Sequence, residues 1–183
     1  MRYARLLGLL AALAVALVPP AGAREQRLTR SLTADRAAVT DLLARIAVNR
    51  DATWQWERTM QHQRTPSEAG VSAIRSVPYG RWVLALWRQR ALAARRQAMN
   101  PPHKRAWVCI HRYEAGWTDA GGPYYGGLQM DVEFQTTFGR GLYRRKGTAD
   151  HWTPLEQMWA AERAYRTRGF WPWPNTARYC GLL

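Results

Sequence analysis

The sequence predicts a mainly α-helical protein, in which a helical N-terminal region precedes an α+β domain with only a minimal β element. Val39, Leu42 and Ile46 recur at helical spacing in the first half. Residues 153–156 (Thr-Pro-Leu-Glu) form a capping box with proline at the first helical position, which predicts a late helix to about residue 167. Residues 124–130 are too short and too rich in glycine for a good strand, so a small hairpin or an irregular loop is expected there.

The first 23 residues have the pattern of a secretory signal peptide. Arg2 and Arg5 precede an apolar run over 6–18, and two prolines and a small-x-small site over 21–23 follow it. That run is shorter than the ~20 residues that span a bilayer. We expect cleavage after Ala23, a secreted, extracytoplasmic protein and no transmembrane segment after cleavage. An uncleaved anchor is the alternative.

Residues 24–102 predict a helical hairpin or arm. One helix is expected over 31–62, and the capping box at 65–68 (Thr-Pro-Ser-Glu) predicts that a second helix starts there. Pro78 and Gly80 are expected to interrupt it, before it resumes over 81–99 and ends at 100–102, Asn-Pro-Pro. The expected use of this region is packing against the second half, through the inward-facing side chains of Leu42, Ile46, Trp82 and Trp87. An electrostatic anchor to the anionic cell wall is the alternative.

The charge of the chain is strongly positive and uneven. The formal net charge is +14, and residues 24–105 hold sixteen basic and six acidic side chains, whereas 106–183 hold nine and seven. Such a surface attracts anionic polymers, among them wall glycopolymers, lipid headgroups and nucleic acids. The alternative is an arginine-rich composition on a solvated helix surface.

Residues 103–183 form the second predicted domain, with helices expected over 103–114 and around 132–138. The two cysteines of the chain, Cys109 and Cys180, both lie in it. Two cysteines in a secreted protein suggest one disulfide, and two free thiols are the alternative.

Glu114 is the candidate catalytic acid. It lies at the last turn of the helix predicted over 103–114, just before Gly116, a C-terminal cap. The negative end of a helix and burial beside Trp107, Trp117 and the Tyr124-Tyr125 pair would both favour a protonated carboxylic acid. Cleavage of a glycosidic bond requires such an acid, because the leaving oxygen must receive a proton.

Aromatic rings around Glu114 suit a sugar polymer. Flat rings cover the apolar faces of pyranoses, and glycines at 126 and 127 allow a saccharide to approach the backbone. Packing in the core is the alternative for each ring. The candidate rings are Trp117, Tyr125, Trp152, Trp171 and Trp173.

The run from Cys109 to Cys180 resembles the catalytic domain of the resuscitation-promoting factors, a transglycosylase-like family with the lysozyme fold. The matching residues are Cys109, Glu114, Trp117, the segment 124–129 (Tyr-Tyr-Gly-Gly-Leu-Gln), Asp131, the segment 155–163 (Leu-Glu-Gln-Met-Trp-Ala-Ala-Glu-Arg) and Trp173-Pro174. The resemblance implies a lysozyme-like catalytic domain over 103–183, with Glu114 as the catalytic acid and a Cys109–Cys180 disulfide. It implies the glycan strand of bacterial peptidoglycan as substrate, with neither cofactor nor metal. The substrate-binding residues expected on this basis are Trp117, Tyr124, Tyr125, Gln129, Asp131, Trp152 and Trp173.

The chain departs from the family at several positions that bear on mechanism. Cys109 lies five residues before the glutamate instead of directly before it, and Arg168 stands where the family often has glutamine. C-type lysozymes carry a second carboxylate at the position of Tyr124, and retaining hydrolysis needs that group. These features favour a lytic transglycosylase, in which Glu114 acts as acid and then as base while the substrate's own N-acetyl group or 6-hydroxyl attacks the anomeric carbon. Asp131 is expected to line the cleft or, alternatively, to cap a helix.

Other classes of function fit the sequence less well. His111-x-x-Glu114 is at most half a metal site, since the chain has no His-Glu-x-x-His motif. No nucleic-acid-binding module is recognisable. The main alternative is a non-catalytic peptidoglycan-binding protein of the same fold, and anionic cell-wall polymers are a second candidate partner.

Overall fold

The structure, a computed structural model, describes residues 21–67 and 74–183. It is mainly helical, which confirms the predicted class. Within the described residues there is no named strand, and the minimal β element is a single isolated bridge between Tyr125 and Met130. The helices are α1 (Ala21–Met60), α2 (Val77–Met99), α3 (Lys104–Tyr113), α4 (Val132–Phe138), α5 (Arg140–Lys146), the 3₁₀ helix η2 (Ala149–His151), α6 (Pro154–Arg168) and α7 (Pro174–Tyr179).

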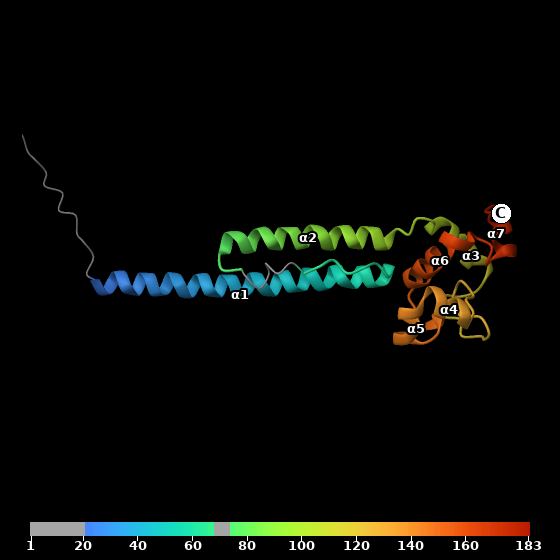
Figure 1. Cartoon of the computed structure of the whole chain (residues 1–183), viewed down its shortest axis with the longest axis horizontal. Helices are drawn as coiled ribbons and strands as arrows, with labels where there is room; N and C mark the ends of the chain where they lie inside the picture. Colours follow the sequence, from blue (N-terminus) through green and yellow to red (C-terminus); the bar gives the residue numbers. More distant parts are fainter. Residues whose placement is uncertain (1–20, 68–73) are drawn as a thin grey trace, which may run out of the picture.

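The molecule is elongated, with a long helical hairpin at one end and a small globular part at the other (Figure 1). α1 and α2 run side by side, and the N-terminal part of α1 extends beyond the start of α2. The predicted signal peptide over 1–23 lies almost wholly outside the described residues, and α1 begins within its cleavage site, at Ala21.

The hairpin has a hydrophobic core of its own. Leu42, Ile46 and Trp87 are at most 5% exposed, and they pack with Ile74, Val83 and Leu84. Trp82 is instead 56% exposed. The expectation that these four residues pack against the second half is therefore wrong, because three of them fill the α1–α2 interface and the fourth faces solvent.

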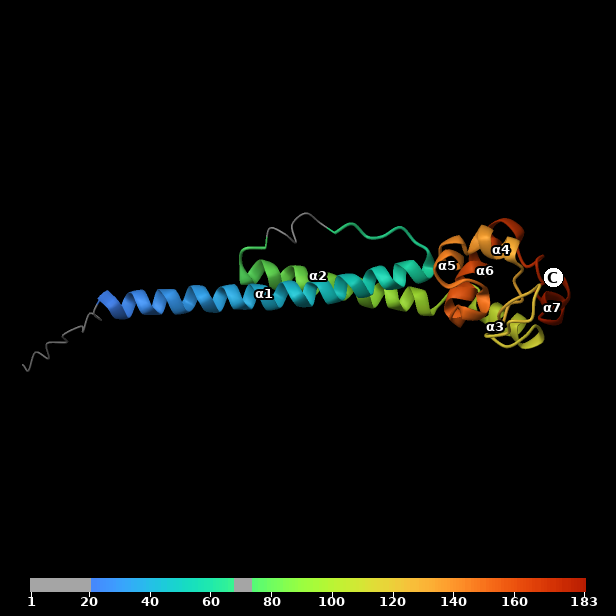
Figure 2. The same cartoon turned by 90° about the horizontal axis from the view of Figure 1, so that it is seen from below.

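The capping box at Thr65 does not start a helix. Residues 62–67 have no regular structure, 68–73 lie outside the described residues, and α2 begins only at Val77. The Thr65 backbone N–H donates to Glu57 Oε2 at 2.9 Å, and the Thr65 hydroxyl donates to Glu57 Oε1, so α1 holds this threonine in place. Residues 62–67 run back along the flank of the hairpin (Figure 2). Pro78, expected to interrupt a helix, instead lies in the first turn of α2.

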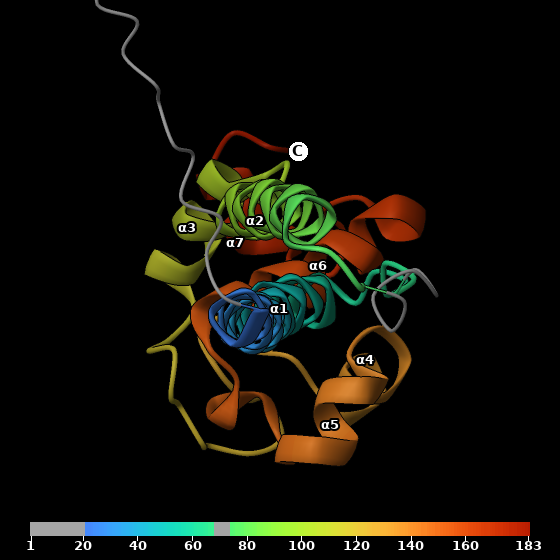
Figure 3. The ribbon, with the colours of Figure 1, turned by 90° about the vertical axis from the view of Figure 1, so that its left-hand side faces the viewer.

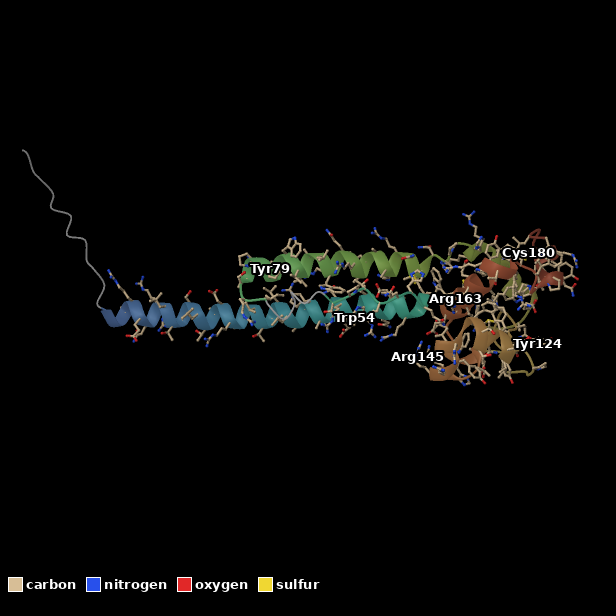
Figure 4. All side chains as sticks on the ribbon, viewed as in Figure 1. Trp54, Tyr79, Tyr124, Arg145, Arg163 and Cys180 are labelled. Carbon is tan, nitrogen blue, oxygen red and sulfur yellow. A yellow bond between two sulfur atoms is a disulfide. The ribbon has the colours of Figure 1, made fainter. Side chains whose placement is uncertain are left out.

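The paired ends of α1 and α2 contact α6, and in the view along the hairpin α6 lies behind these two helices (Figure 3). Trp159 on α6 is 3% exposed and packs with Met60 and Ala98, and its indole N–H donates to the carbonyl of Ala98 at 2.8 Å. Arg163, labelled at this junction in Figure 4, donates to the carbonyl of Met60 at 3.3 Å and also to that of Phe138. Cations are favourable at such helix C-termini. Only the end of the hairpin thus contacts the globular part.

The globular part packs around α6. Its core includes Trp107, Ile110, Leu128, Phe134 and Trp173, all less than 10% exposed. The Thr153 capping box is fully formed: Thr153 Oγ1 accepts from the Glu156 N–H, and the Thr153 N–H donates to the Glu156 carboxylate at 2.8 Å.

The predicted disulfide is present and joins α3 to the residue after α7. Cys109 and Cys180 are bonded, with Cα atoms 6.0 Å apart. A disulfide is compatible with secretion, since such bonds persist in oxidising compartments. None of the helices described here is both long and apolar enough to cross a membrane.

Candidate functional site

Glu114 lies at the C-terminus of α3, as expected, but it is itself the C-cap residue, so the expectation that Gly116 caps this helix is wrong. Its backbone N–H donates to the carbonyls of Ile110 and His111, at 3.1 and 3.3 Å. Its side chain is half-buried, and Oε1 accepts a 2.8 Å hydrogen bond from the hydroxyl of Thr176 on α7. Oε2 has no hydrogen-bond partner within residues 21–67 and 74–183. α3 therefore fixes the backbone of Glu114 and α7 fixes Oε1, and Oε2 is left available to a ligand.

The loop between α3 and α4 folds back on itself at the Tyr125–Met130 bridge. Each of these two residues donates its N–H to the other's carbonyl at 3.0 Å. Gln129, at φ 45°, turns its side-chain amide back to Asp119 Oδ2 at 2.8 Å and to the carbonyl of Gly126 at 3.0 Å. The side chain of Gln129 thus stabilises the loop, and its amide nitrogen is already hydrogen-bonded within the protein.

Trp117 is half-buried and stacked on His111. The ring centroids are 3.9 Å apart and the planes are inclined by 22°. Gly127 lies directly beside them, because a Cβ there would come within 2.6 Å of His111 Nδ1 and 2.7 Å of the Trp117 ring. The stack therefore requires glycine at position 127, and His111 is engaged in packing beside Glu114.

Gln157 on α6 anchors the loop between α3 and α4 through its side-chain amide. It is fully buried, and its side-chain nitrogen lies 2.7, 2.9 and 3.1 Å from the carbonyl oxygens of Trp117, Ala149 and Trp152. Buried carbonyls need such partners, since an unmet one costs free energy. Gln157 thereby ties the Trp117 and Trp152 segments to the central helix.

Several of the predicted site residues line a hollow of about 170 Å³. Tyr124, 49% exposed, forms part of its wall, and Figure 4 shows this residue at the end of the molecule far from the hairpin. Glu114 does not line the hollow. The hydroxyl of Thr176, its hydrogen-bond partner, lies 3.5 Å from the carbonyl oxygen of Trp173, and Trp173 lines the hollow. The lining residues are Tyr124, Gln129, Met130, Asp131, Phe134, Arg168, Pro172 and Trp173.

Two predicted sugar platforms are buried instead. Trp152 is 2% exposed and its indole N–H donates to the carbonyl of Gly147 at 3.0 Å. Trp173 is 4% exposed and donates to the carbonyl of Leu128 at 2.6 Å, so it offers only a small part of its surface to the hollow. Both rings fill the core, which corrects their assignment as open platforms. Trp171, 63% exposed, has an accessible ring, and Tyr125 is half-buried against the core.

Asp131 combines the two uses that the sequence left open. Its Oδ1 accepts from the backbone N–H of Phe134 at 2.6 Å, which makes it the N-cap of α4. The same residue lines the hollow.

Sequence reasoning gave no role to two residues that position the site, Thr176 and Glu162. Glu162 on α6 is 4% exposed, and its Oε1 accepts from the Trp107 indole N–H at 2.8 Å and from the backbone N–H of His103 at 2.7 Å. It therefore holds the N-terminal turn of α3, the helix that ends at Glu114. The available signal was the presence of polar residues, Gln157 and Glu162 among them, between the apolar side chains on the buried side of α6.

Within the described part of the chain, no group of three or more histidine, cysteine or acidic side chains is arranged to hold a metal ion. Comparisons of the chain with models of known families, with curated proteins and with solved structures found no match.

Proposed function

We propose that the protein is a secreted peptidoglycan-cleaving enzyme, a single-glutamate lytic transglycosylase with a lysozyme-like catalytic domain over 103–183. The observation that carries the proposal is the placement of Glu114. Its carboxyl group lies at a helix end and is held through one oxygen by Thr176, and His111 of the same helix contacts Gly127 in the loop whose motif resembles that of the resuscitation-promoting factors. Remodelling of the cell wall or resuscitation from dormancy is the process that the resemblance suggests.

The proposed chemistry uses Glu114 twice. Protonated Glu114 gives its proton to the glycosidic oxygen as the bond to the anomeric carbon breaks. The ionised carboxylate then takes a proton from the substrate's 6-hydroxyl as that oxygen attacks the same carbon, which leaves an anhydro end and restores the acid. The hydrogen bond from Thr176 to Oε1 supports this assignment, because it orients the carboxyl group and leaves Oε2 to exchange the proton.

The carboxylates of Asp119 and Asp131, in the segment between α3 and α4, support a single-glutamate mechanism over retaining hydrolysis. Asp119 accepts from the Gln129 amide, and Asp131 accepts from the backbone of α4. Both are thus engaged in holding the local fold. A retaining glycosidase needs a second carboxylate about 5 Å from the acid to act as nucleophile, and position 124, where C-type lysozymes have theirs, is a tyrosine.

The hollow supports a saccharide as ligand. It is small, and it joins the exposed ring of Tyr124 to the polar side chains of Asp131 and Arg168. Small-molecule sites combine these features, because aromatic surface supplies contact area and a few polar groups fix the orientation of the ligand.

Digestion of purified sacculi by the mature protein tests the proposal. Soluble muropeptides with anhydro ends, identified by mass spectrometry, are the expected products. Reducing ends would indicate hydrolysis and contradict the lytic mechanism. Sacculi that bind the protein and stay intact would replace the proposal with the alternative, a non-catalytic peptidoglycan-binding protein.

A further inference from the structure

α2 presents an arginine-rich outer face that nothing in the catalytic proposal uses. The helix carries five arginines and no acidic residue in 23 residues. Its buried residues, among them Val83, Leu84 and Trp87, face α1. Arg81, Arg88 and Arg95 are exposed and recur every seven residues, so they lie on one face, with ~10 Å of helix rise between successive members.

Large apolar side chains lie on this outer face or at its edge, where Trp82, one residue after Arg81, stands about 100° around the helix. Trp82 is 56% exposed, Leu92 is 59% exposed and Met99 is 38% exposed. Trp82 stacks on Tyr79, with ring centroids 5.7 Å apart and planes inclined by 19°, at the end of α2 far from the globular part (Figure 4). Positions 92 and 99 follow 81 by three and five turns, which places Leu92 and Met99 among the arginines.

We infer that the outer face of α2 binds the surface of an anionic lipid bilayer. Arginines in contact with such a surface each contribute about 1 kcal/mol. Tryptophan, tyrosine and leucine side chains are the groups that insert at the boundary between headgroups and acyl chains. A dissolved polyanion would satisfy the arginines alone, because it offers no apolar phase for Trp82 and Leu92. The combination therefore favours a membrane over a soluble polymer.

The geometry of the hairpin suits this role. Because the hairpin has its own core, α2 can lie along a surface without unfolding. Only the ends of α1 and α2 meet the globular part, so the outer face of α2 stays exposed along its length. The inference is independent of catalysis, and loss of Glu114 activity would leave it standing.

Co-sedimentation of the full mature protein with vesicles tests the inference. Vesicles of phosphatidylcholine and phosphatidylglycerol in equal parts should bind the protein in a salt-sensitive manner, whereas vesicles of phosphatidylcholine alone should not. The variant Arg81→Gln/Arg88→Gln/Arg95→Gln should bind the anionic vesicles about 100-fold more weakly, as three contacts of about 1 kcal/mol predict. The matched control Arg105→Gln/Arg144→Gln/Arg145→Gln removes the same charge from exposed positions of the globular part and should bind much as the wild type does.

A second variant separates the membrane from a soluble polyanion. Trp82→Ala/Leu92→Ala should weaken vesicle binding on the order of tenfold and leave binding of polyphosphate unchanged. Circular dichroism and size-exclusion chromatography verify that each variant keeps its helix content and mass. Equal losses in the triple variant and its control would overturn the inference. So would equal binding to neutral vesicles, or binding to polyphosphate without binding to vesicles.

Discussion

Glu162 offers a quantitative test of how the site is positioned. Its Oε1 accepts from the Trp107 indole N–H, on a residue that is fully buried, and from the backbone N–H of His103. In Glu162→Leu, a change of similar volume, both donors lose this acceptor. An unmet buried donor costs about 1–3 kcal/mol, so the loss of both bonds should lower the free energy of unfolding by about 2–6 kcal/mol.

Urea unfolding followed by circular dichroism measures this loss, with the disulfide intact in every sample. The melting temperature should fall by about 2–4 °C for each kcal/mol in a chain of this size. Glu162→Gln serves as the matched control, because its side-chain oxygen still accepts from Trp107 and His103, and it should lose clearly less. If Glu162→Leu unfolded within 0.5 kcal/mol of the wild type, the claim that Glu162 holds α3 would be refuted.

Three further predictions address the disulfide, the junction and the hairpin. Reduction of Cys109–Cys180, which closes a loop of 71 residues, should lower the free energy of unfolding by about 2–5 kcal/mol; a transition unchanged by reductant would contradict this. Burial and the charge of Arg166 lower the pKa of His62 below 6.5. Because the unfolded state then takes up this proton first, the stabilisation present above pH 6.5 should be lost as the pH falls through the lowered pKa. His62→Gln should flatten that part of the pH profile, and an unchanged profile would rule His62 out as its cause. A fragment of residues 103–183 exposes Trp159 and should be about 2–3 kcal/mol less stable than the full mature chain; equal stability would show that the junction contributes nothing.

Two similar sequence motifs show where local reasoning succeeds and where it fails. Thr-Pro-x-Glu occurs at 65–68 and at 153–156. At Thr153 the capping box forms as predicted, because the glutamate three residues later reaches back to its own turn. At Thr65 a different glutamate, Glu57 of the preceding helix, takes the threonine's N–H and hydroxyl. A tertiary contact overrides the local preference, and no reading of residues 65–68 alone would reveal it.

In the candidate site, too, the sequence predicted the features that depend on local structure and missed those that depend on tertiary contacts. Helix ends and chain order were sufficient to place Glu114 at the end of α3, and the cysteine count was sufficient to suggest one disulfide. Whether an aromatic ring is exposed or buried was harder to predict, because a tryptophan in a sugar cleft and a tryptophan in a core have the same local sequence preferences. Trp152 and Trp173 lie in the core, because Trp152 packs beside Gly139 and Trp173 packs against Trp107 and Phe134, and the positions of these partners depend on the tertiary fold. Thr176 was missed because its partner is 62 residues away in the chain.

The central claim is that the Glu114 carboxyl group transfers the proton that cleaves the glycan strand. Release of soluble muropeptides from purified sacculi by Glu114→Gln, compared with the wild type, tests it most directly. Glutamine keeps the shape of the side chain and an oxygen for the Thr176 hydroxyl, but it cannot supply a proton at neutral pH. The matched control Glu133→Gln makes the same change at an exposed position on α4. The account predicts that Glu114→Gln lowers the rate of release by ~10² or more, keeps its binding to sacculi, and leaves the control near the wild-type rate. Release by Glu114→Gln at close to the wild-type rate would contradict the account.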